Sequence, residues 1–182
     1  MRTEIRLAGF GGQGIILAGY VLGKAASLFA GKNATMTQSY GPEARGGACA
    51  SNVVIEDERI SYPAATHPDI VVLMSQEAYD VYKPDIRENT RVVYDEDLVK
   101  LESGLPGERI PVPAMRLAGD LGRKVVANIV MLGFLTGATG VLSKEAVKQA
   151  VLSSVPAHTK DLNDKAFECG YERGLQARGK GP

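Results

Sequence analysis

The sequence predicts one α/β domain in which helices cover both faces of a mixed, Rossmann-like sheet, a three-layer α/β/α arrangement. Three observations lead to this prediction. An apolar segment at 5–8 ends in glycine and leads into a helical pattern, a continuous β-branched run lies at 69–74, and the chain after Pro113 is mostly helical in pattern. Strands that alternate with helices are typical of sheets with parallel neighbours, and a wholly apolar strand is typical of a sheet covered on both faces.

The first half of the chain is expected to form one side of the sheet and the first helix. Apolar residues recur in that helix at helical intervals, and the extended segments are bounded by glycine, proline and acidic residues. The expected elements are a strand at 5–8, a helix at 14–29 that Gly31 ends, a strand at 34–37, a loop containing Gly41-Pro42 and Gly46-Gly47, and a hairpin of strands 48–55 and 59–62.

The second half is expected to add three strands and then helices. Ser143 is a predicted N-cap, because its hydroxyl can accept from a first-turn N–H group. The strands are expected at 69–74, 91–94 and 108–112, and the helices at 115–137, 144–154 and 161–177. No repeat or linker divides the sequence, so we expect one domain at 1–177 and a short disordered tail at 178–182.

Composition excludes several classes of protein. The formal net charge is zero, whereas a general nucleic-acid binder needs clustered Lys and Arg. No apolar run approaches the roughly 20 residues of a membrane span, and no secretion signal is recognisable at the N-terminus. The two cysteines, Cys49 and Cys169, are too few for an iron–sulfur cluster and are interpreted as small apolar residues. A cytoplasmic location is expected.

The segment after the first strand, residues 9–14, reads Gly-Phe-Gly-Gly-Gln-Gly and opens a helix. Glycines let a backbone approach a ligand closely, and the N–H groups and dipole of a helix N-terminus favour phosphate. The alternative is that the glycines only permit a tight turn. The candidate residues for binding a phosphate-bearing cofactor are Gly9, Gly11, Gly12, Gln13 and Gly14.

A nicotinamide dinucleotide is a weaker interpretation of this loop. Dinucleotide-binding folds place an acid about 20 residues on, at the tip of the second strand, where it binds the ribose hydroxyls. Residues 35–39 contain no acid, and the first acid after them is Glu43.

A second glycine-containing loop follows the strand at 34–37. The carboxyl ends of strands in an open α/β sheet gather where ligands bind, so this loop is expected beside the first. Arginine binds phosphate bidentately. The alternative is a solvated loop in which Arg45 pairs with Glu43. The candidates here are Ser39, Tyr40, Arg45, Gly46 and Gly47.

The sequence contains no recognisable catalytic or metal-ligating set. Asn128 lies among apolar residues of a predicted helix, and we expect it to hydrogen-bond to a loop carbonyl, with contact to the cofactor as the alternative. His158 lies in a connector after Pro156 and has no evident partner in the sequence. Catalytic residues and metal ligands are therefore expected to be absent from this chain.

Four segments in this order, 9–15, 38–47, 113–118 and 128–133, resemble one known family. They are similar to the gamma subunit of 2-oxoacid:ferredoxin oxidoreductases of the 2-oxoglutarate, pyruvate and ketoisovalerate types, and particularly to the 2-oxoglutarate type. The resemblance runs from about residue 3 to residue 176.

This resemblance implies a subunit whose chemistry is completed by partners. The whole enzyme converts a 2-oxoacid, coenzyme A and oxidised ferredoxin into acyl-CoA, carbon dioxide and reduced ferredoxin. Thiamine diphosphate lies between alpha-type and beta-type parts, and iron–sulfur clusters lie in the beta-type part and a ferredoxin-like delta subunit. The gamma unit resembles the domain that closes over coenzyme A in single-chain relatives, so residues 11–14 and 39–47 are expected to contact its phosphates.

The isolated chain is expected to be inactive. It is also expected to dimerise when purified alone, because surfaces meant for partners are apolar. Two other functions remain as alternatives: a free-standing NAD(P)-binding oxidoreductase, and a scaffold whose glycine loop only packs against partners.

Overall fold

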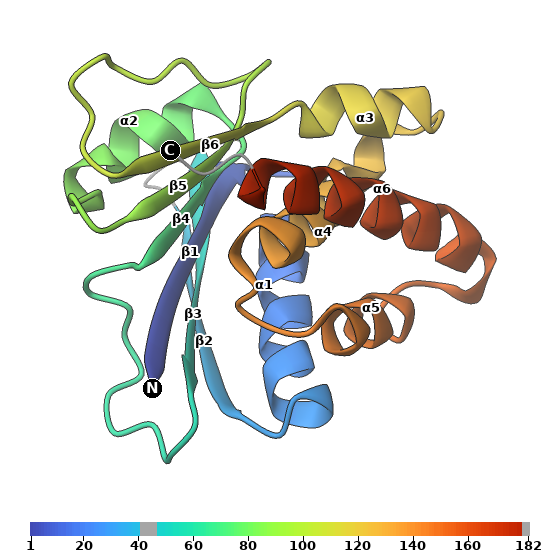
Figure 1. Ribbon diagram of the computed structural model, residues 1–182, viewed down its shortest axis with the longest axis horizontal. Coiled ribbons are helices and arrows are strands. Elements are labelled where there is room, and N and C mark those ends of the chain that lie inside the picture. Colours follow the sequence, from blue (N-terminus) through green and yellow to red (C-terminus); the bar gives the residue numbers. More distant parts are fainter. Residues whose placement is uncertain (41–46, 180–182) are drawn as a thin grey trace.

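The computed structural model describes residues 1–40 and 47–179, and they form the predicted three-layer α/β/α domain with a mixed sheet (Figure 1). The sheet has the strand order β2-β3-β1-β4-β5-β6. β3 is antiparallel to its neighbours β1 and β2, while β1, β4, β5 and β6 are parallel. The strands are β1 (Arg2–Phe10), β2 (Asn33–Tyr40), β3 (Ala48–Glu56), β4 (Ile70–Leu73), β5 (Arg91–Asp95) and β6 (Glu108–Val112).

The helices are distributed unequally over the two faces of the sheet. The α2 face is covered mainly by that one short helix, whereas α1, α4, α5 and α6 lie on the opposite face (Figure 1). The α-helices are α1 (Ile15–Lys24), α2 (Gln76–Tyr82), α3 (Ala114–Asp120), α4 (Ala127–Thr139), α5 (Lys144–Leu152) and α6 (Lys160–Arg178). Shorter helical turns are η1 (Ala25–Phe29), η2 (Lys83–Asp85), η3 (Lys124–Val126) and η4 (Ala157–Thr159).

The predicted hairpin between 48–55 and 59–62 is wrong. β3 instead pairs with β2 on one side and with β1 on the other, so it is buried inside the sheet. Residues 59–62 are not a strand; the Arg2 guanidinium donates to the carbonyls of Tyr62 and Ala64 at 2.9 and 3.0 Å and holds this segment against the sheet. The turn residues after β3 indicate where the strand ends, but they do not indicate which strands pair with it.

The predicted helix at 115–137 is also wrong, because two helices occupy this segment. α3 ends where the N–H of Arg123 donates to the carbonyl of Ala118 at 3.1 Å and that of Gly122 donates to Gly119 at 2.8 Å. This pattern is a Schellman motif, which glycine favours at the position of Gly122. The break turns Arg123 and Val125 away from the core, and both are exposed.

α4 and α6 contact each other through their backbones. α4 is buried along nearly its whole length. A Cβ atom added at Gly170 of α6 would lie 2.0 Å from the Val130 carbonyl oxygen, and one added at Gly133 of α4 would lie 2.1 Å from the Phe167 carbonyl oxygen. Glycine at these positions allows an approach that any larger residue prevents.

Of three other local expectations, the N-cap of the helix at 144–154 is confirmed, and two others differ from the structure in their bounds. The Ser143 hydroxyl accepts a hydrogen bond from the N–H of Ala146 at 3.2 Å and caps α5. The strand predicted at 34–37 is present but longer, so Ser39 and Tyr40 belong to β2 rather than to the loop. α6 continues to Arg178, and residues 180–182 of the predicted tail lie outside the described residues.

Candidate functional site

The glycine loop connects the carboxyl end of β1 to the N-terminus of α1. Gly12 and Gly14 have φ angles of +98° and +75°. L-residues with a side chain rarely adopt this region, so the conformation of the loop requires glycine at both positions. Gly14 is the N-cap of α1. The loop therefore exposes backbone at the start of a helix, as predicted.

Gln13 holds the loop in shape. Its side-chain oxygen accepts a hydrogen bond from the N–H of Phe10 at 2.7 Å, and its side-chain nitrogen donates to the carbonyl of Met74 at 2.8 Å. Met74 directly follows β4, the parallel neighbour of β1. The amide of Gln13 thus ties the glycine loop to the end of the next strand. This side chain therefore has a structural role in the loop, and its predicted contact with a cofactor stays a prediction.

The N-terminus of α1 has no side-chain cap and no acidic residue in its first turn. The first N–H groups of an α-helix have no partner inside the helix. Among the described residues, the N–H groups of Gly12 and Gly14 also meet no acceptor, whereas that of Gln13 donates to Phe10. These donors and the positive end of the helix dipole together favour an anion in front of the loop.

Asn128 at the start of α4 supports the loop from behind. Its side-chain nitrogen donates to the carbonyl of Gly14 at 3.3 Å, which confirms the predicted bond to a loop carbonyl. The contact is so close that a Cβ atom at Gly14 would lie 2.3 Å from this nitrogen. Asn128 is 4% exposed, so the polar bond lies inside the protein and fixes α4 against the loop.

A cavity of about 400 Å³ opens beside the loop between α1, α4 and the start of α6. One wall is apolar and the rim carries polar and basic groups. Its lining includes Gly12 and Gly14 of the loop, the apolar residues Leu17, Val125, Val126, Ile129, Val155, Pro156 and Leu162, and the polar residues Arg123, Asn128, His158, Thr159 and Asn163. Concave sites with an apolar body and a few polar groups are typical of ligand pockets.

Arg123 and His158 are the basic residues on this rim, and sequence reasoning missed both as site residues. Arg123 follows the α3 break, and His158 lies in η4, immediately before α6. Both side chains are exposed, so they are accessible to an anion at the mouth of the cavity. Gly122 could have indicated that a helix ends just before Arg123, because glycine commonly ends helices. No residue near His158 in the sequence indicated that it would lie beside the glycine loop.

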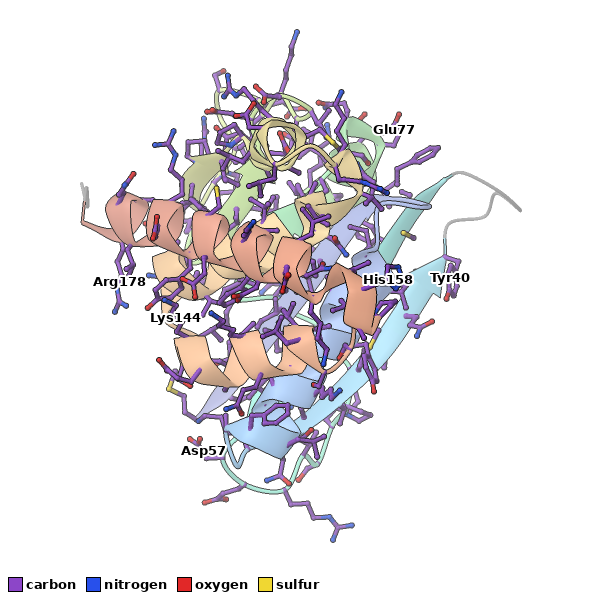
Figure 2. The ribbon with its side chains drawn as sticks, turned by 90° about the vertical axis from the view of Figure 1, so that its right-hand side faces the viewer. Tyr40, Asp57, Glu77, Lys144, His158 and Arg178 are labelled. Carbon is purple, nitrogen blue, oxygen red and sulfur yellow. The ribbon has the colours of Figure 1, made fainter. Side chains whose placement is uncertain are left out.

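The second loop begins beside the first, as predicted. The N–H of Gly11 donates to the carbonyl of Gly47 at 3.3 Å. Tyr40 and Gly9 are both in register with Cys49 on β3, so the ends of β2 and β1 lie about 10 Å apart, two strand spacings. Tyr40 is exposed and lies on the same side as His158 in Figure 2.

The remaining candidates of the second loop divide into two groups. Ser39 is exposed at the end of β2, and Gly47 lies next to Gly11. Arg45 and Gly46 lie outside the described residues, as does Glu43, so their predicted contacts stay predictions.

Within residues 1–40 and 47–179, no group of His, Cys, Asp and Glu could hold a metal ion. Cys49 is buried, and burial raises the pKa of its thiol, which suits an apolar role and not a nucleophile. Burial also raises the pKa of Asp95, whose carboxylate accepts from the N–H groups of Met115 and Asp97 and so supports α3. In the described part of the chain, no helix is both long and apolar enough for a membrane crossing.

A comparison with known protein families matches most of the chain. The model described as pyruvate ferredoxin/flavodoxin oxidoreductase matches residues 4–173. The chain is similar to the 2-oxoglutarate synthase subunit KorC of Methanocaldococcus jannaschii, with 53% identity over 176 residues and coverage of 94% of each chain.

Two solved structures have the same fold. The gamma subunit of a keto/oxoacid ferredoxin oxidoreductase from Geobacter sulfurreducens matches with a TM-score of 0.89, 44% identity, and coverage of 97% of this chain and 98% of that one. A 2-oxoglutarate:ferredoxin oxidoreductase from Magnetococcus marinus, with 2-oxoglutarate, coenzyme A and succinyl-CoA bound, matches with a TM-score of 0.86 and 25% identity. The match covers 96% of this chain and 31% of the Magnetococcus chain.

Proposed function

The chain belongs to the pyruvate ferredoxin/flavodoxin oxidoreductase family as a gamma-type subunit, and from this premise we propose that it supplies a coenzyme A-binding surface to a 2-oxoglutarate:ferredoxin oxidoreductase. The complete enzyme would convert 2-oxoglutarate, coenzyme A and oxidised ferredoxin into succinyl-CoA, carbon dioxide and reduced ferredoxin. Thiamine diphosphate and iron–sulfur clusters would belong to alpha-type, beta-type and ferredoxin-like partners in the cytoplasm.

The choice of 2-oxoglutarate is supported by the relatives. The Methanocaldococcus relative at 53% identity is named a 2-oxoglutarate synthase subunit, and the Magnetococcus enzyme was solved with 2-oxoglutarate and succinyl-CoA bound. This chain carries no recognisable set of catalytic residues in its described part, so the 2-oxoacid would be bound and decarboxylated on partner chains.

The observation that carries the coenzyme A proposal is the N-terminus of α1, which has no side-chain cap and lies at the rim of a cavity of about 400 Å³. Coenzyme A joins phosphate groups to a purine and to a largely apolar pantetheine arm. The N–H groups of Gly12 and Gly14 and the guanidinium of Arg123 would bind a phosphate. The apolar wall that contains Leu17, Ile129 and Leu162 would cover a neighbouring uncharged part of the molecule.

This arrangement would make the chain a binding component without its own chemistry. A phosphate held at the helix N-terminus would orient the thiol of coenzyme A toward the partner that forms the acyl group. Holding two reactants in one geometry can lower a barrier by several kcal/mol without any group that transfers protons or electrons.

The test is to substitute Arg123 in the complete assembly. Arg123→Ala should raise the KM for coenzyme A about tenfold and leave the KM for 2-oxoglutarate unchanged, because a charge-assisted hydrogen bond contributes about 1.5 kcal/mol. Arg123→Lys should recover part of the loss. Arg59→Ala is the matched control, since Arg59 is exposed in the segment after β3, away from the cavity lining. An unchanged KM for coenzyme A in Arg123→Ala would refute the contact.

The two alternatives predict other outcomes. An NAD(P)-binding enzyme needs an acid at the tip of β2, and the strand ends in Gln38-Ser39-Tyr40 instead. Calorimetry that detects NADH binding and no coenzyme A binding would favour that enzyme. A scaffold would lose assembly when Gly12 is replaced by valine, while the coenzyme A affinity of any complex that still forms would be unchanged.

A further inference from the structure

A second groove lies at the other edge of the sheet, between β6 and the C-terminal halves of α4 and α6. Its volume is about 910 Å³, and four arginines, Arg91, Arg109, Arg173 and Arg178, line it. We call it the arginine groove. It lies far from the glycine loop, since α6 spans about 28 Å at 1.5 Å per residue and Figure 2 shows His158 and Arg178 at its opposite ends.

The arginine groove is positively charged although the chain as a whole has a net charge of zero. Its two acidic residues are already paired: Glu108 with Arg91 at 3.2 Å, and Glu96 with Arg116 at 3.0 Å. Among the described residues, the guanidinium nitrogens of Arg109, Arg173 and Arg178 form no ion pair with a carboxylate oxygen within 4 Å, unlike those of Arg91 and Arg116. An anion in the groove would therefore meet guanidinium groups that have no competing carboxylate partner.

The charges are spread along the groove and do not surround a single point. Ile110 belongs to the core under α4 and α6, so by strand alternation Arg109 projects to the other face of β6. There it donates to the carbonyls of Ser103 and Leu105 at 2.8 and 2.7 Å. Arg178 lies instead next to Gly140, at the end of α4. An extended ligand can reach both sides of β6, whereas one small anion cannot.

The floor and the edge of the groove also restrict its occupant. Ile110, Phe134 and Ala138 form an apolar floor. β6 is an edge strand, but Pro111 lies in it and has no N–H group to donate. Addition of a continuous β-strand is therefore disfavoured, and side chains would make the main contacts. Carboxylates would bind the arginines, and aliphatic groups would cover the floor.

We propose that the arginine groove docks an acidic polypeptide segment of a partner subunit. The proposal rests on the function proposed above, because it takes the chain to be a subunit of a larger assembly. It adds a contact surface separate from the coenzyme A site, with arginine–carboxylate pairs around an apolar centre. Such pairs would set the orientation of the partner and make its association sensitive to salt.

The first test measures association of the full chain with the purified partner subunits by biolayer interferometry. The double variant Arg173→Glu and Arg178→Glu should raise the dissociation constant at least tenfold at about 0.15 M salt. The neutral pair Arg173→Gln and Arg178→Gln should raise it less, which keeps the test informative if the glutamate pair folds poorly. The control is Arg59→Glu with Lys165→Glu, which makes the same charge change at exposed positions outside the groove.

The second test locates the contact by chemical coupling. Arg173→Lys places an amine in the groove, and a carbodiimide joins amines to carboxylates that they touch. Mass spectrometry of the treated assembly should find position 173 of the Arg173→Lys variant coupled to an Asp or Glu of a partner. Lys165, which is exposed and lies outside the groove, is the internal control and should not be coupled to a partner.

Three results would overturn the docking proposal. The first is that the groove variants and the control variant bind the partner subunits with equal affinity. The second is that no coupled product forms at position 173. The third is that the isolated chain binds pyrophosphate saturably and that the groove variants abolish this binding. The first two leave the coenzyme A proposal intact, because its own readout is the KM in Arg123→Ala. A chain that binds no partner subunit at all would instead refute the proposed function.

Discussion

Replacement of Gly170 by alanine is expected to destabilise the domain through the contact between α4 and α6. The added Cβ atom would lie 2.0 Å from the Val130 carbonyl oxygen and 2.9 Å from the Phe134 amide nitrogen. Both are backbone atoms of α4, so no side chain can rotate away to make room. The two helices must move apart, and the buried rings of Phe134 and Phe167 lose part of their packing.

The magnitude follows from two opposing effects. Overpacking a well-packed core costs about 1 to 3 kcal/mol, and the upper value applies where backbone blocks relaxation. Alanine in a helix is favoured over glycine by about 1 kcal/mol. The net loss in the free energy of unfolding is about 2 kcal/mol, which lowers Tm by about 4 to 8 °C in a domain of this size.

The assay is thermal and urea unfolding followed by circular dichroism at 222 nm. The matched control is Gly119→Ala in α3, where the nearest atom to an added Cβ is a Lys124 side-chain carbon 3.9 Å away. That variant should be as stable as the parent or up to about 1 kcal/mol more stable. Stability of Gly170→Ala equal to or above the parent, with an unchanged urea m-value, would refute the close contact.

Three further predictions concern the glycine loop and α5–α6. Gln13→Ala removes the bonds to Phe10 and Met74 and should cost about 1 to 3 kcal/mol in urea unfolding, whereas the exposed Gln149→Ala should be near neutral. Gly14→Ala should cost about 1 to 2 kcal/mol by the same measurement, because φ is +75° and Asn128 is in the way, while Gly23→Ala meets open space and should not destabilise. Hydrogen bonds from Lys144 and Lys148 lower the pKa of Glu168 below its ordinary value of 4.5. The ionised carboxylate therefore stabilises the fold fully above pH 4.5, and this contribution is lost as the pH falls through the lowered pKa. Glu168→Gln should therefore lose about 0.5 kcal/mol near pH 7, and this deficit should shrink as the pH falls through the lowered pKa in acid-unfolding curves; a deficit that does not change with pH would contradict this.

Local sequence signals were sufficient to predict much of the fold and the glycine loop of the candidate site. The glycine spacing identified the turn from β1 into α1, since only glycine readily adopts the backbone of Gly12 and Gly14. Asn128 was correctly expected to bond to a loop carbonyl, because a buried amide among apolar residues must find a partner. Ser143 was likewise found from its capping chemistry alone.

The failures depend on contacts between segments far apart in the sequence. Strand pairing decides that β3 joins β1 and β2, and no turn signal near 56–62 encodes that choice. His158 reaches the cavity only because α6 packs on α4, which places its N-terminal end near the glycine loop. Arg123 could have been found by weighing Gly122 as a helix end, but the surrounding apolar pattern suggested one continuous helix.

The Gln13 side chain, which bridges the glycine loop and the end of β4, has a consequence for how fast a ligand binds. The bridge uses only atoms of the protein, so the donors are already aimed before any anion arrives. Little conformational entropy then remains to be lost on binding. Stopped-flow traces of association should follow a single exponential whose rate rises linearly with ligand concentration, and affinity differences among anions should reside in how quickly each one leaves.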